Sequence, residues 1–192
     1  DTLVIFTSDN GCSKAANFEK LAEKGHRVSG LYRGSKADLW EGGHRVPFFA
    51  RWPGEIPPGS QCNETICLTD FFATIADLLI DDIPDASAED SVSFFSAFHD
   101  QPLVTDRNGL IHSSISGHFG YRMGHWKLLL SRGSGGWTTP NENAAKQQKL
   151  PAYQLYNMAN DPNESQNLGS EQREIAHHLY TLLRADIERG RS

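Results

Sequence analysis

The chain has 192 residues and a formal net charge of −6, with 38% hydrophobic and 22% charged residues, which is typical of one globular domain with or without a small appendage. We expect no nucleic-acid partner, because an acidic chain lacks the basic face that neutralises phosphates. We also expect no membrane partner, because no apolar run approaches the ~20 residues that a membrane helix needs. The start of the chain shows no signal segment.

The first predicted element is a strand over residues 2–7, a run of β-branched and apolar side chains that Asp9, Asn10 and Gly11 follow. Buried strands of open α/β sheets are continuous apolar runs of this kind, and ligands bind beyond their carboxyl ends. Asp9 and Asn10 offer the oxygen ligands that Ca²⁺ or Mg²⁺ prefers. The same residues also favour a plain turn, so local chemistry leaves both interpretations open.

The next elements are a short helix and a long loop. Ser13 is a candidate N-cap for a helix over 13–25, which Gly25 would end. Residues 32–47 are rich in glycine and charge and have no clean periodicity, so they predict a loop, and Lys36 lies within it. A strand limited by its prolines is predicted over 46–53.

The middle of the chain predicts a helix and a linker. Thr69 is a candidate cap for a helix over 70–79, whose apolar residues recur at helical spacing. The acidic, proline-containing stretch 81–90 is typical of a linker, and 91–98 predicts another short helix.

From residue 110 onward the pattern is that of short strands followed by one helix, a small α+β unit in which the helix covers a sheet face. The predicted elements are a strand over 110–115, a β-hairpin over 118–130 around Gly124, an exposed loop over 134–149, a strand over 153–157, a turn over 160–163, and an amphipathic helix from Ser170 to Gly190. The predicted fold class is therefore α/β, with one domain over 1–105 and an α+β subdomain over 106–192.

Several motifs occur in an order and at a spacing that resemble the C-terminal half of a type I (arylsulfatase-like) sulfatase of the alkaline phosphatase superfamily. They are Thr7-Ser8-Asp9-Asn10-Gly11, Arg33-Gly34-Ser35-Lys36, Glu41-Gly42-Gly43-x-Arg45-Val46-Pro47, Trp52-Pro53-Gly54, Gly124-His125-Trp126-Lys127-Leu128 and Leu155-Tyr156-Asn157-x-x-x-Asp161-Pro162-x-Glu164. Each piece alone is weak, but the compound pattern is specific and spans nearly the whole chain.

The resemblance implies roles for particular residues. Asp9 and Asn10 match the pair that holds the active-site Ca²⁺, with Mg²⁺ the less favoured ion, and Lys36 matches the lysine that contacts the substrate sulfate. A solvated loop lysine is the plain alternative for Lys36. His112, at a predicted strand end, is a candidate for contact with the substrate at the cleft rim, although a structural histidine is the commoner case.

Other residues of the motifs are expected to be structural. Arg33, Glu41 and Arg45 should pair within the loop and so hold Lys36 in place.

Two features of the family are absent. The Cys/Ser-x-Pro/Ala-x-Arg motif that yields the formylglycine nucleophile does not occur in this chain, nor do the family's upstream acidic metal ligands. Because the chain opens inside a strand, we expect it to be the C-terminal portion of a longer sulfatase, unable to catalyse alone, with the formylglycine in the missing N-terminal part.

The resemblance further implies a sulfate ester as substrate, either an aryl sulfate or a sulfated carbohydrate. It implies the remainder of the sulfatase polypeptide as partner, and a periplasmic, extracellular or lysosomal location. Two alternatives stay open: a phosphodiesterase or phosphonate hydrolase of the same superfamily, and a non-catalytic module that binds sulfated glycans or a protein.

Overall fold

The structure is a computed structural model that describes residues 2–79, 82–84, 87–105 and 107–191. It consists of two compact units that interleave along the chain. Unit 1 comprises Asp1–Thr7, Pro47–Leu110 and Arg184–Ser192, and unit 2 comprises Ser8–Val46 and Ile111–Leu183. The domain boundary at 105/106 stays a prediction, and one of its two residues, 106, lies outside the described residues.

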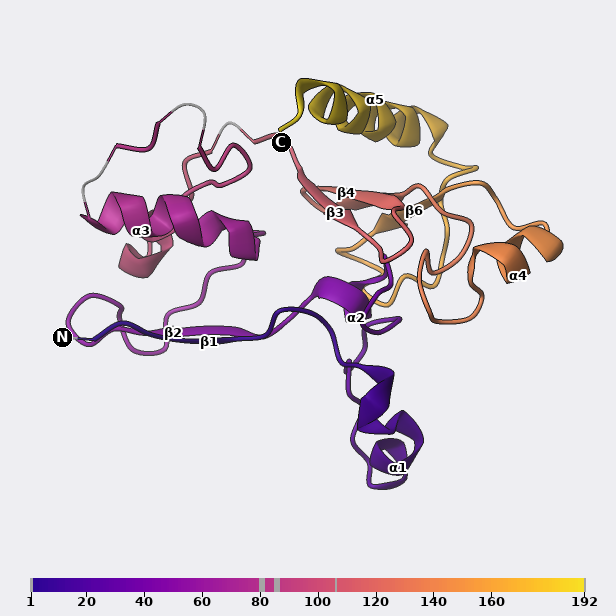
Figure 1. The fold of residues 1–192 in the computed structure, drawn as a ribbon, viewed down its shortest axis with the longest axis horizontal. Helices are drawn as coiled ribbons and strands as arrows, with labels where there is room; N and C mark the ends of the chain where they lie inside the picture. The colour runs from indigo at the N-terminus through magenta and orange to yellow at the C-terminus, as the bar shows by residue number, and fades with distance from the viewer. Residues whose placement is uncertain (1, 80–81, 85–86, 106, 192) are drawn as a thin grey trace. The chain divides into compact units, whose positions relative to one another are not determined.

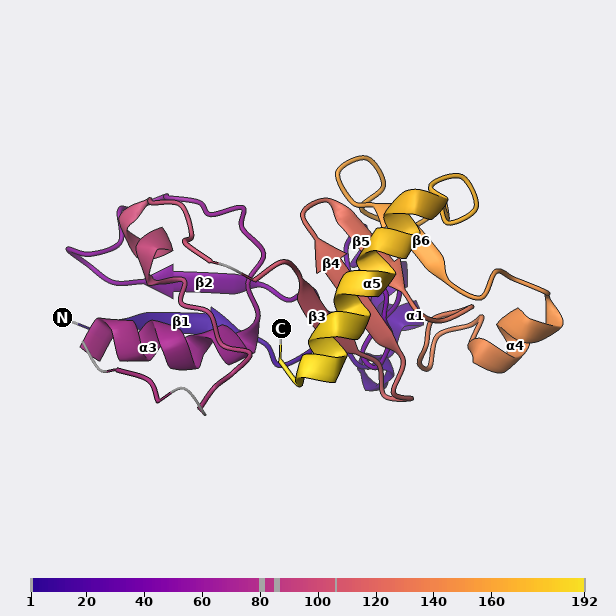
Figure 2. The same ribbon diagram turned by 90° about the horizontal axis from the view of Figure 1, so that it is seen from above.

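Unit 1 combines a two-stranded antiparallel sheet with one helix. Its elements are β1 (Val4–Thr7), β2 (Phe48–Arg51), the 3₁₀ segments η2 (Leu68–Asp70) and η3 (Phe95–His99), and α3 (Phe71–Leu79). The pairing of β1 with β2 places Val4 opposite Arg51 and Phe6 opposite Phe49. α3 lies over one face of this sheet (Figures 1 and 2), where Phe48 and Phe71 are in contact with ring centroids 5.7 Å apart.

The prediction of a buried first strand is wrong for this unit. Val4 is 53% exposed, Phe6 64% and Phe49 65%, because only the α3 side of the two-stranded sheet is covered within unit 1. The strand itself is confirmed, and it ends at Thr7, directly before Asp9 and Asn10.

The core of unit 1 is aromatic. Phe94 contacts Phe48, Phe71 and Phe98 edge-on, with ring centroids 5.4 to 5.6 Å apart, the arrangement that aromatic quadrupoles favour. The helix over 71–79 is confirmed, but Thr69 is not its cap. Thr69 lies inside η2, and the entry to the helix is held by Asp70, which accepts a hydrogen bond from the Cys67 N–H at 2.8 Å.

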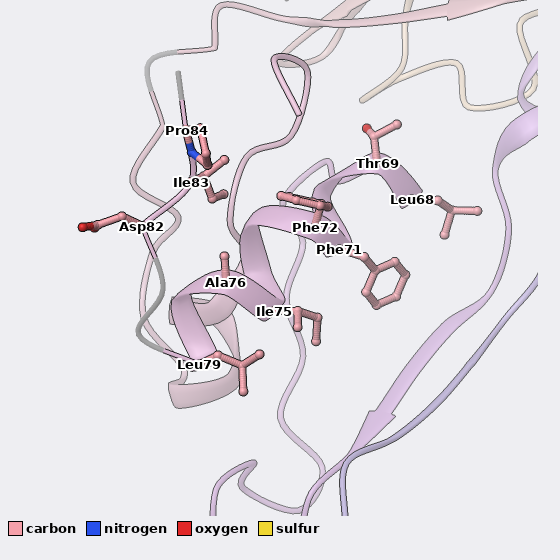
Figure 3. Close-up of a pocket in the computed structure, with 10 residues that line it drawn as sticks. All are labelled: Leu68, Thr69, Phe71, Phe72, Ile75, Ala76, Leu79, Asp82, Ile83 and Pro84. Carbon is pink, nitrogen blue, oxygen red and sulfur yellow. The ribbon is translucent and has the colours of Figure 1, made fainter. Parts of the chain in front are cut away.

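An apolar groove runs along α3 in unit 1 (Figure 3). Its lining residues are Leu68, Thr69, Phe71, Phe72, Ile75, Ala76, Leu79, Asp82, Ile83 and Pro84. Among the described lining residues the one charged side chain is that of Asp82, which is acidic and does not favour an anionic ligand. Residues 82–84 and 87–90 form no helix or strand, as the predicted linker requires, whereas 81, 85 and 86 lie outside the described residues.

Unit 2 is built on a four-stranded sheet in the order β3-β4-β5-β6, in which β5 pairs antiparallel with both β4 and β6. Its elements are η1 (Lys14–Ala16), α1 (Phe18–Glu23), α2 (Glu41–His44), β3 (Leu110–Ser113), β4 (Phe119–Met123), β5 (Trp126–Leu129), α4 (Glu142–Gln147), β6 (Gln154–Asn157) and most of α5 (Arg173–Arg189). Figure 1 shows α5 and α2 on opposite sides of this sheet.

The two faces of β5 bury different residues. Leu128 pairs with Leu155 of β6, and on the α5 side Leu179 and Leu183 are fully buried, as the predicted amphipathic helix requires. Lys127 and Leu129 alternate with Leu128 and therefore point to the α2 side. There a core cluster is formed by Leu39, Trp40, Leu129, Tyr156 and Met158.

The hairpin around Gly124, the strand β6 and the C-terminal helix are confirmed, and the α/β fold class with them. Two predicted loops were wrong in part. The loop over 32–47 contains the helix α2, and the supposedly exposed loop over 134–149 contains α4 and the buried residues Ser134 and Gly135. Within the described part of the chain, no helix is long and apolar enough to cross a membrane.

Candidate functional site

The three residues singled out by the motifs lie on backbone segments that are hydrogen-bonded to each other in unit 2. The Gly11 N–H donates to the Gly43 carbonyl at 2.9 Å, and the Lys36 N–H donates to the Cys12 carbonyl at 3.0 Å. These bonds attach the turn with Asp9 and Asn10 to the loop with Lys36. The structure therefore brings the predicted metal ligands and the predicted sulfate contact to one edge of unit 2.

The oxygen atoms of this turn suit a hard cation. Asp9 is exposed, and its carboxylate makes no hydrogen bond or ion pair with the residues that the structure describes. The Asn10 Nδ2 donates to the Gly11 carbonyl at 3.0 Å, which leaves the amide oxygen as the free ligand atom. Ca²⁺ takes about six to eight oxygen ligands. Two side chains therefore supply only part of a shell, and no group of three or more acidic, histidine or cysteine residues that could hold a metal occurs among the described residues.

Three glycines allow the turn and the loop to approach so closely. A Cβ on Gly11 would lie 1.8 Å from the Gly42 carbonyl oxygen, one on Gly42 would lie 2.3 Å from the Gly34 oxygen, and one on Gly43 would lie 2.2 Å from the Asp38 oxygen. Any side chain at these positions would push backbone against backbone. The glycines of the motifs are thus required by close packing rather than by turn formation.

The buried side chain of Asp38 connects the Lys36 loop to the segment that contains Thr138. This buried carboxylate accepts hydrogen bonds from the Ser35 N–H at 2.8 Å and from the Thr138 N–H at 3.0 Å. Ala37 adopts a left-handed conformation with φ of +85°, an uncommon state for a residue with a Cβ. The Lys36 side chain is partly exposed and makes no hydrogen bond or ion pair with any described residue, so its ammonium is available to an anion.

Two residues of α2 form a cluster with Lys127 of β5 and with Glu164. We call Lys127, Glu41, Glu164 and His44 the Lys127 cluster. The Lys127 Nζ donates to the Glu41 Oε1 and the Glu164 Oε1, both at 2.8 Å, and lies 3.3 Å from the His44 Nε2. Lys127 and Glu164 are 0% exposed and Glu41 is 5% exposed. The three N–H groups of the ammonium thus each have an acceptor.

The two carboxylates of the Lys127 cluster respond differently to their surroundings. Burial pushes the pKa of Glu41 upward, but the charges and hydrogen bonds of Lys127, Arg122 and Arg45 outweigh it, so the pKa is lowered. For Glu164, burial outweighs the attraction of Lys127, and the pKa is raised. Glu41 is therefore the better-compensated carboxylate, and Glu164 depends on Lys127 to stay ionised.

His44 and His112 stack with ring centroids 4.0 Å apart and an angle of 27° between their planes. The His112 Nε2–H donates to the Leu39 carbonyl at 3.2 Å. Burial lowers the pKa of both rings, followed by the charge of Lys127 for His44 and by the charge of His44 for His112, and the pKa of His44 falls to about 3. Both rings are neutral at neutral pH. His112 thus has a structural role, and its contact with substrate stays a prediction.

The expected pairing of the loop charges is confirmed for Glu41 and Arg45, which lie 3.2 Å apart, but it is wrong for Arg33. The Arg33 guanidinium stacks 3.6 Å over the Trp40 ring and donates to the Glu164 carbonyl at 2.9 Å. Its stacking partner thus lies in the loop, but its hydrogen-bond acceptor is a backbone carbonyl near the C-terminal end of unit 2 and not a loop carboxylate.

Lys127 and Glu164 lie within two of the motifs, but the motifs alone predict no role for either residue. A usable signal was the position of Lys127 in an otherwise apolar strand, Trp126-Lys127-Leu128-Leu129-Leu130, where a charge needs a buried counter-ion.

Comparison with known proteins points to the sulfatases. The family model described as Sulfatase matches residues 1–81. An N-acetylgalactosamine-6-O-sulfatase from Bacteroides thetaiotaomicron is 29% identical over 188 residues, which cover 95% of this chain and 36% of the relative. Human arylsulfatase A is 31% identical over 183 residues, which cover 88% of this chain and 33% of the relative.

A solved structure supports the same assignment. It belongs to a Bacteroides thetaiotaomicron protein from work on the metabolism of multiple glycosaminoglycans, with a TM-score of 0.77, 28% identity, and coverage of 96% of this chain and 38% of that one. The chain spans about a third of the length of these relatives. These likenesses support a type I sulfatase of the alkaline phosphatase superfamily, whose C-terminal portion this chain resembles.

Proposed function

We propose that this chain supplies one side of the active site of a Ca²⁺-dependent sulfatase that hydrolyses sulfate esters. Asp9 and Asn10 would provide oxygen ligands to the cation, and Lys36 would contact the sulfate group. The observation that carries the proposal is the pair of backbone hydrogen bonds that attach the Asp9–Asn10 turn to the Lys36 loop. The segments that carry a carboxylate, an amide oxygen and an ammonium are thereby joined, and none of these three groups has a hydrogen bond or ion pair with another residue that the structure describes.

The chemistry of these groups suits a sulfate ester. A divalent cation beside the ester would stabilise negative charge as it develops on the transferred group and the leaving oxygen. The Lys36 ammonium would orient the compact anion and neutralise part of its charge. The nucleophile, a formylglycine, is expected in polypeptide outside this chain, so we propose that residues 1–192 alone do not catalyse.

The relatives suggest the class of substrate. One is an N-acetylgalactosamine-6-O-sulfatase and another an arylsulfatase, so we propose a sulfated carbohydrate or an aryl sulfate. The remainder of the sulfatase polypeptide would complete the cation's ligands. A periplasmic, extracellular or lysosomal location remains part of the proposal.

The decisive experiment replaces Lys36 in the full-length enzyme that contains this chain. We expect Lys36→Ala to lower kcat/KM for an aryl sulfate by about 10²–10³-fold, the usual loss when one charge-stabilising group is removed. Because the Lys36 side chain makes no hydrogen bond or ion pair with any described residue, the melting temperature should not change. Lys20→Ala, which removes an exposed lysine on α1, is the matched control and should keep full activity.

The same assay separates the alternatives. Unchanged turnover by Lys36→Ala would sink the assignment of Lys36. Faster cleavage of a phosphodiester than of a sulfate ester would favour a phosphodiesterase or phosphonate hydrolase. Binding of a sulfated glycan with no turnover in the full-length protein would favour a non-catalytic module.

A further inference from the structure

Helix α2 has no cap of its own. Trp40 occupies the N-cap position and makes no side-chain hydrogen bond to the helix. The first N–H, that of Glu41, instead donates to the Glu164 Oε2 at 2.7 Å, across 123 residues of sequence. A carboxylate near a helix N-terminus is favoured both by the free N–H groups and by the helix dipole.

The backbone of Glu164 is held in an unfavourable state. Its φ is +55°, and its side chain is 0% exposed. The left-handed region is strained for a residue with a Cβ. Such states persist only where surrounding contacts fix them, and here those contacts are the Glu41 N–H, Lys127 and the Arg33 guanidinium on the Glu164 carbonyl.

Helix α2 in turn holds both segments of the site. The Gly43 carbonyl accepts from the Gly11 N–H at 2.9 Å, next to Asp9 and Asn10, and the Gly42 N–H donates to the Arg33 carbonyl at 2.7 Å, at the start of the Lys36 loop. Because Gly11, Gly42 and Gly43 pack without room for a Cβ, a shift of α2 would move both segments.

We infer that Glu164 is a positioning residue for the sulfatase site: from the C-terminal part of the chain, it caps α2 and, together with Lys127, sets the placement of the Asp9–Asn10 turn and the Lys36 loop. This inference rests on the proposed function for the identity of the ligands. The placement of the two segments can, however, be tested without any metal or substrate.

Two substitutions and one control make the test. Glu164→Ala removes both contacts of the side chain. Glu164→Gln keeps its shape, but its single oxygen cannot serve the Glu41 N–H and Lys127 together. Asp70→Asn is the matched control, because Asp70 is a 1% exposed carboxylate that binds a backbone N–H and a cation, Arg107, in unit 1.

The first measurement is amide hydrogen exchange of the full-length protein in Ca²⁺-free buffer. We expect exchange in peptides covering 8–12 and 33–44 to be at least ten times faster in Glu164→Ala than in the wild type, with Glu164→Gln intermediate. Asp70→Asn should leave these peptides unchanged and speed exchange near residues 67–74. Fast exchange of α2 in Glu164→Ala with unchanged exchange at 8–12 would overturn the inference.

The second measurement is the Ca²⁺ concentration that gives half-maximal sulfatase activity. It should rise about tenfold in Glu164→Gln and stay unchanged in Asp70→Asn, with saturating Ca²⁺ restoring part of the lost kcat. An unchanged Ca²⁺ requirement in an active Glu164→Gln enzyme would overturn the inference. So would a Glu164→Gln protein that cannot fold, because its defect would then be global. A wild type without sulfatase activity would instead overturn the proposed function, while the exchange result still decides whether Glu164 places the two segments.

Discussion

Units 1 and 2 both bury charged residues, but they compensate the charge in different ways. In unit 1, Arg107 donates to both oxygens of Asp70, at 2.8 and 3.0 Å, so one cation meets one carboxylate. In unit 2, a single ammonium, that of Lys127, serves both Glu41 and Glu164. Asp70 also accepts from the N–H groups of Cys67 and Val92. The carboxylate of unit 1 therefore has two backbone donors besides its cation. In unit 2, Glu41 also pairs with Arg45, whereas Glu164 has only the Glu41 N–H besides Lys127 among the described residues.

The sheets of the two units differ as well. The two strands of unit 1 leave Val4, Phe6 and Phe49 more than half exposed. The four strands of unit 2 bury Leu128 and Leu129 at 1% and 0% exposure. We infer that the packed side chains of unit 2 hold its sheet firmly enough for the Lys127 cluster to determine the position of the Lys36 loop.

The largest expected effect is loss of the shared cation. Lys127→Met should destabilise unit 2 by about 3–5 kcal/mol, because the buried Glu164 would lose its cation and Glu41 would keep only Arg45 and the more distant Arg122. Arg107→Met should destabilise unit 1 by only about 1.5–3 kcal/mol, the scale of lost charged hydrogen bonds, since Asp70 keeps its backbone donors. Hydrogen exchange at increasing denaturant concentration reports the stability of each unit separately. Equal losses of stability in the two units would contradict this prediction.

A smaller effect is expected from crowding the site. Gly11→Ala should cost about 3 kcal/mol in unit 2, because its Cβ would meet the Gly42 carbonyl at 1.8 Å. Gly59→Ala in unit 1, where φ is +79° and no atom lies within 4 Å, should cost about 1 kcal/mol from backbone strain alone. Thermal melts of both variants, with calcium titration of Gly11→Ala, check this order. A harmless Gly11→Ala would show that the turn can move away from α2.

The smallest expected effect is a loss of stability of unit 2 at low pH. Below pH 6.5 the unfolded chain protonates His44 and His112, whereas the folded rings stay neutral, down to about pH 3 for His44. Protonation therefore favours the unfolded state, and stability falls as pH drops from 6.5 towards 3, by about 1.4 kcal/mol at pH 5.5 for His44 and in the same direction for His112. His44→Gln keeps an acceptor for Lys127 and should lose less stability between pH 7.5 and 5.5. A wild type whose unit 2 is equally stable at both values would contradict this.

Much of the fold was predictable because its signals are local. The alternation in 118–130 with Gly124 between the strands, and the spacing of Leu179 and Leu183, each determine an element without help from distant residues. Helix α2 was missed for the opposite reason. Glu41-Gly42-Gly43-His44 has poor helix propensity, and its cap lies 123 residues away.

The residues of the candidate site also divide into those with a local sequence signal and those that depend on distant contacts. Asp9, Asn10 and Lys36 were named because they stand in compact motifs. Lys127 and Glu164 act through contacts spanning 86 and 123 residues, which no local pattern reveals. Helix α4 was missed although Asn141 offered a visible signal, since its side chain caps the helix by accepting from the Ala144 N–H at 3.0 Å.

The large sequence separation between Glu164 and α2 also has a consequence for folding during synthesis. When the ribosome has made α2, the carboxylate that caps it is still 123 residues from being added. At roughly 5–20 residues per second, this gap lasts on the order of ten seconds. For that time the Glu41 N–H lacks the acceptor that it has in the folded chain, although Gly11, Gly42 and Gly43 can already meet their partners. The segments that carry Asp9, Asn10 and Lys36 are therefore translated well before the residue that caps α2.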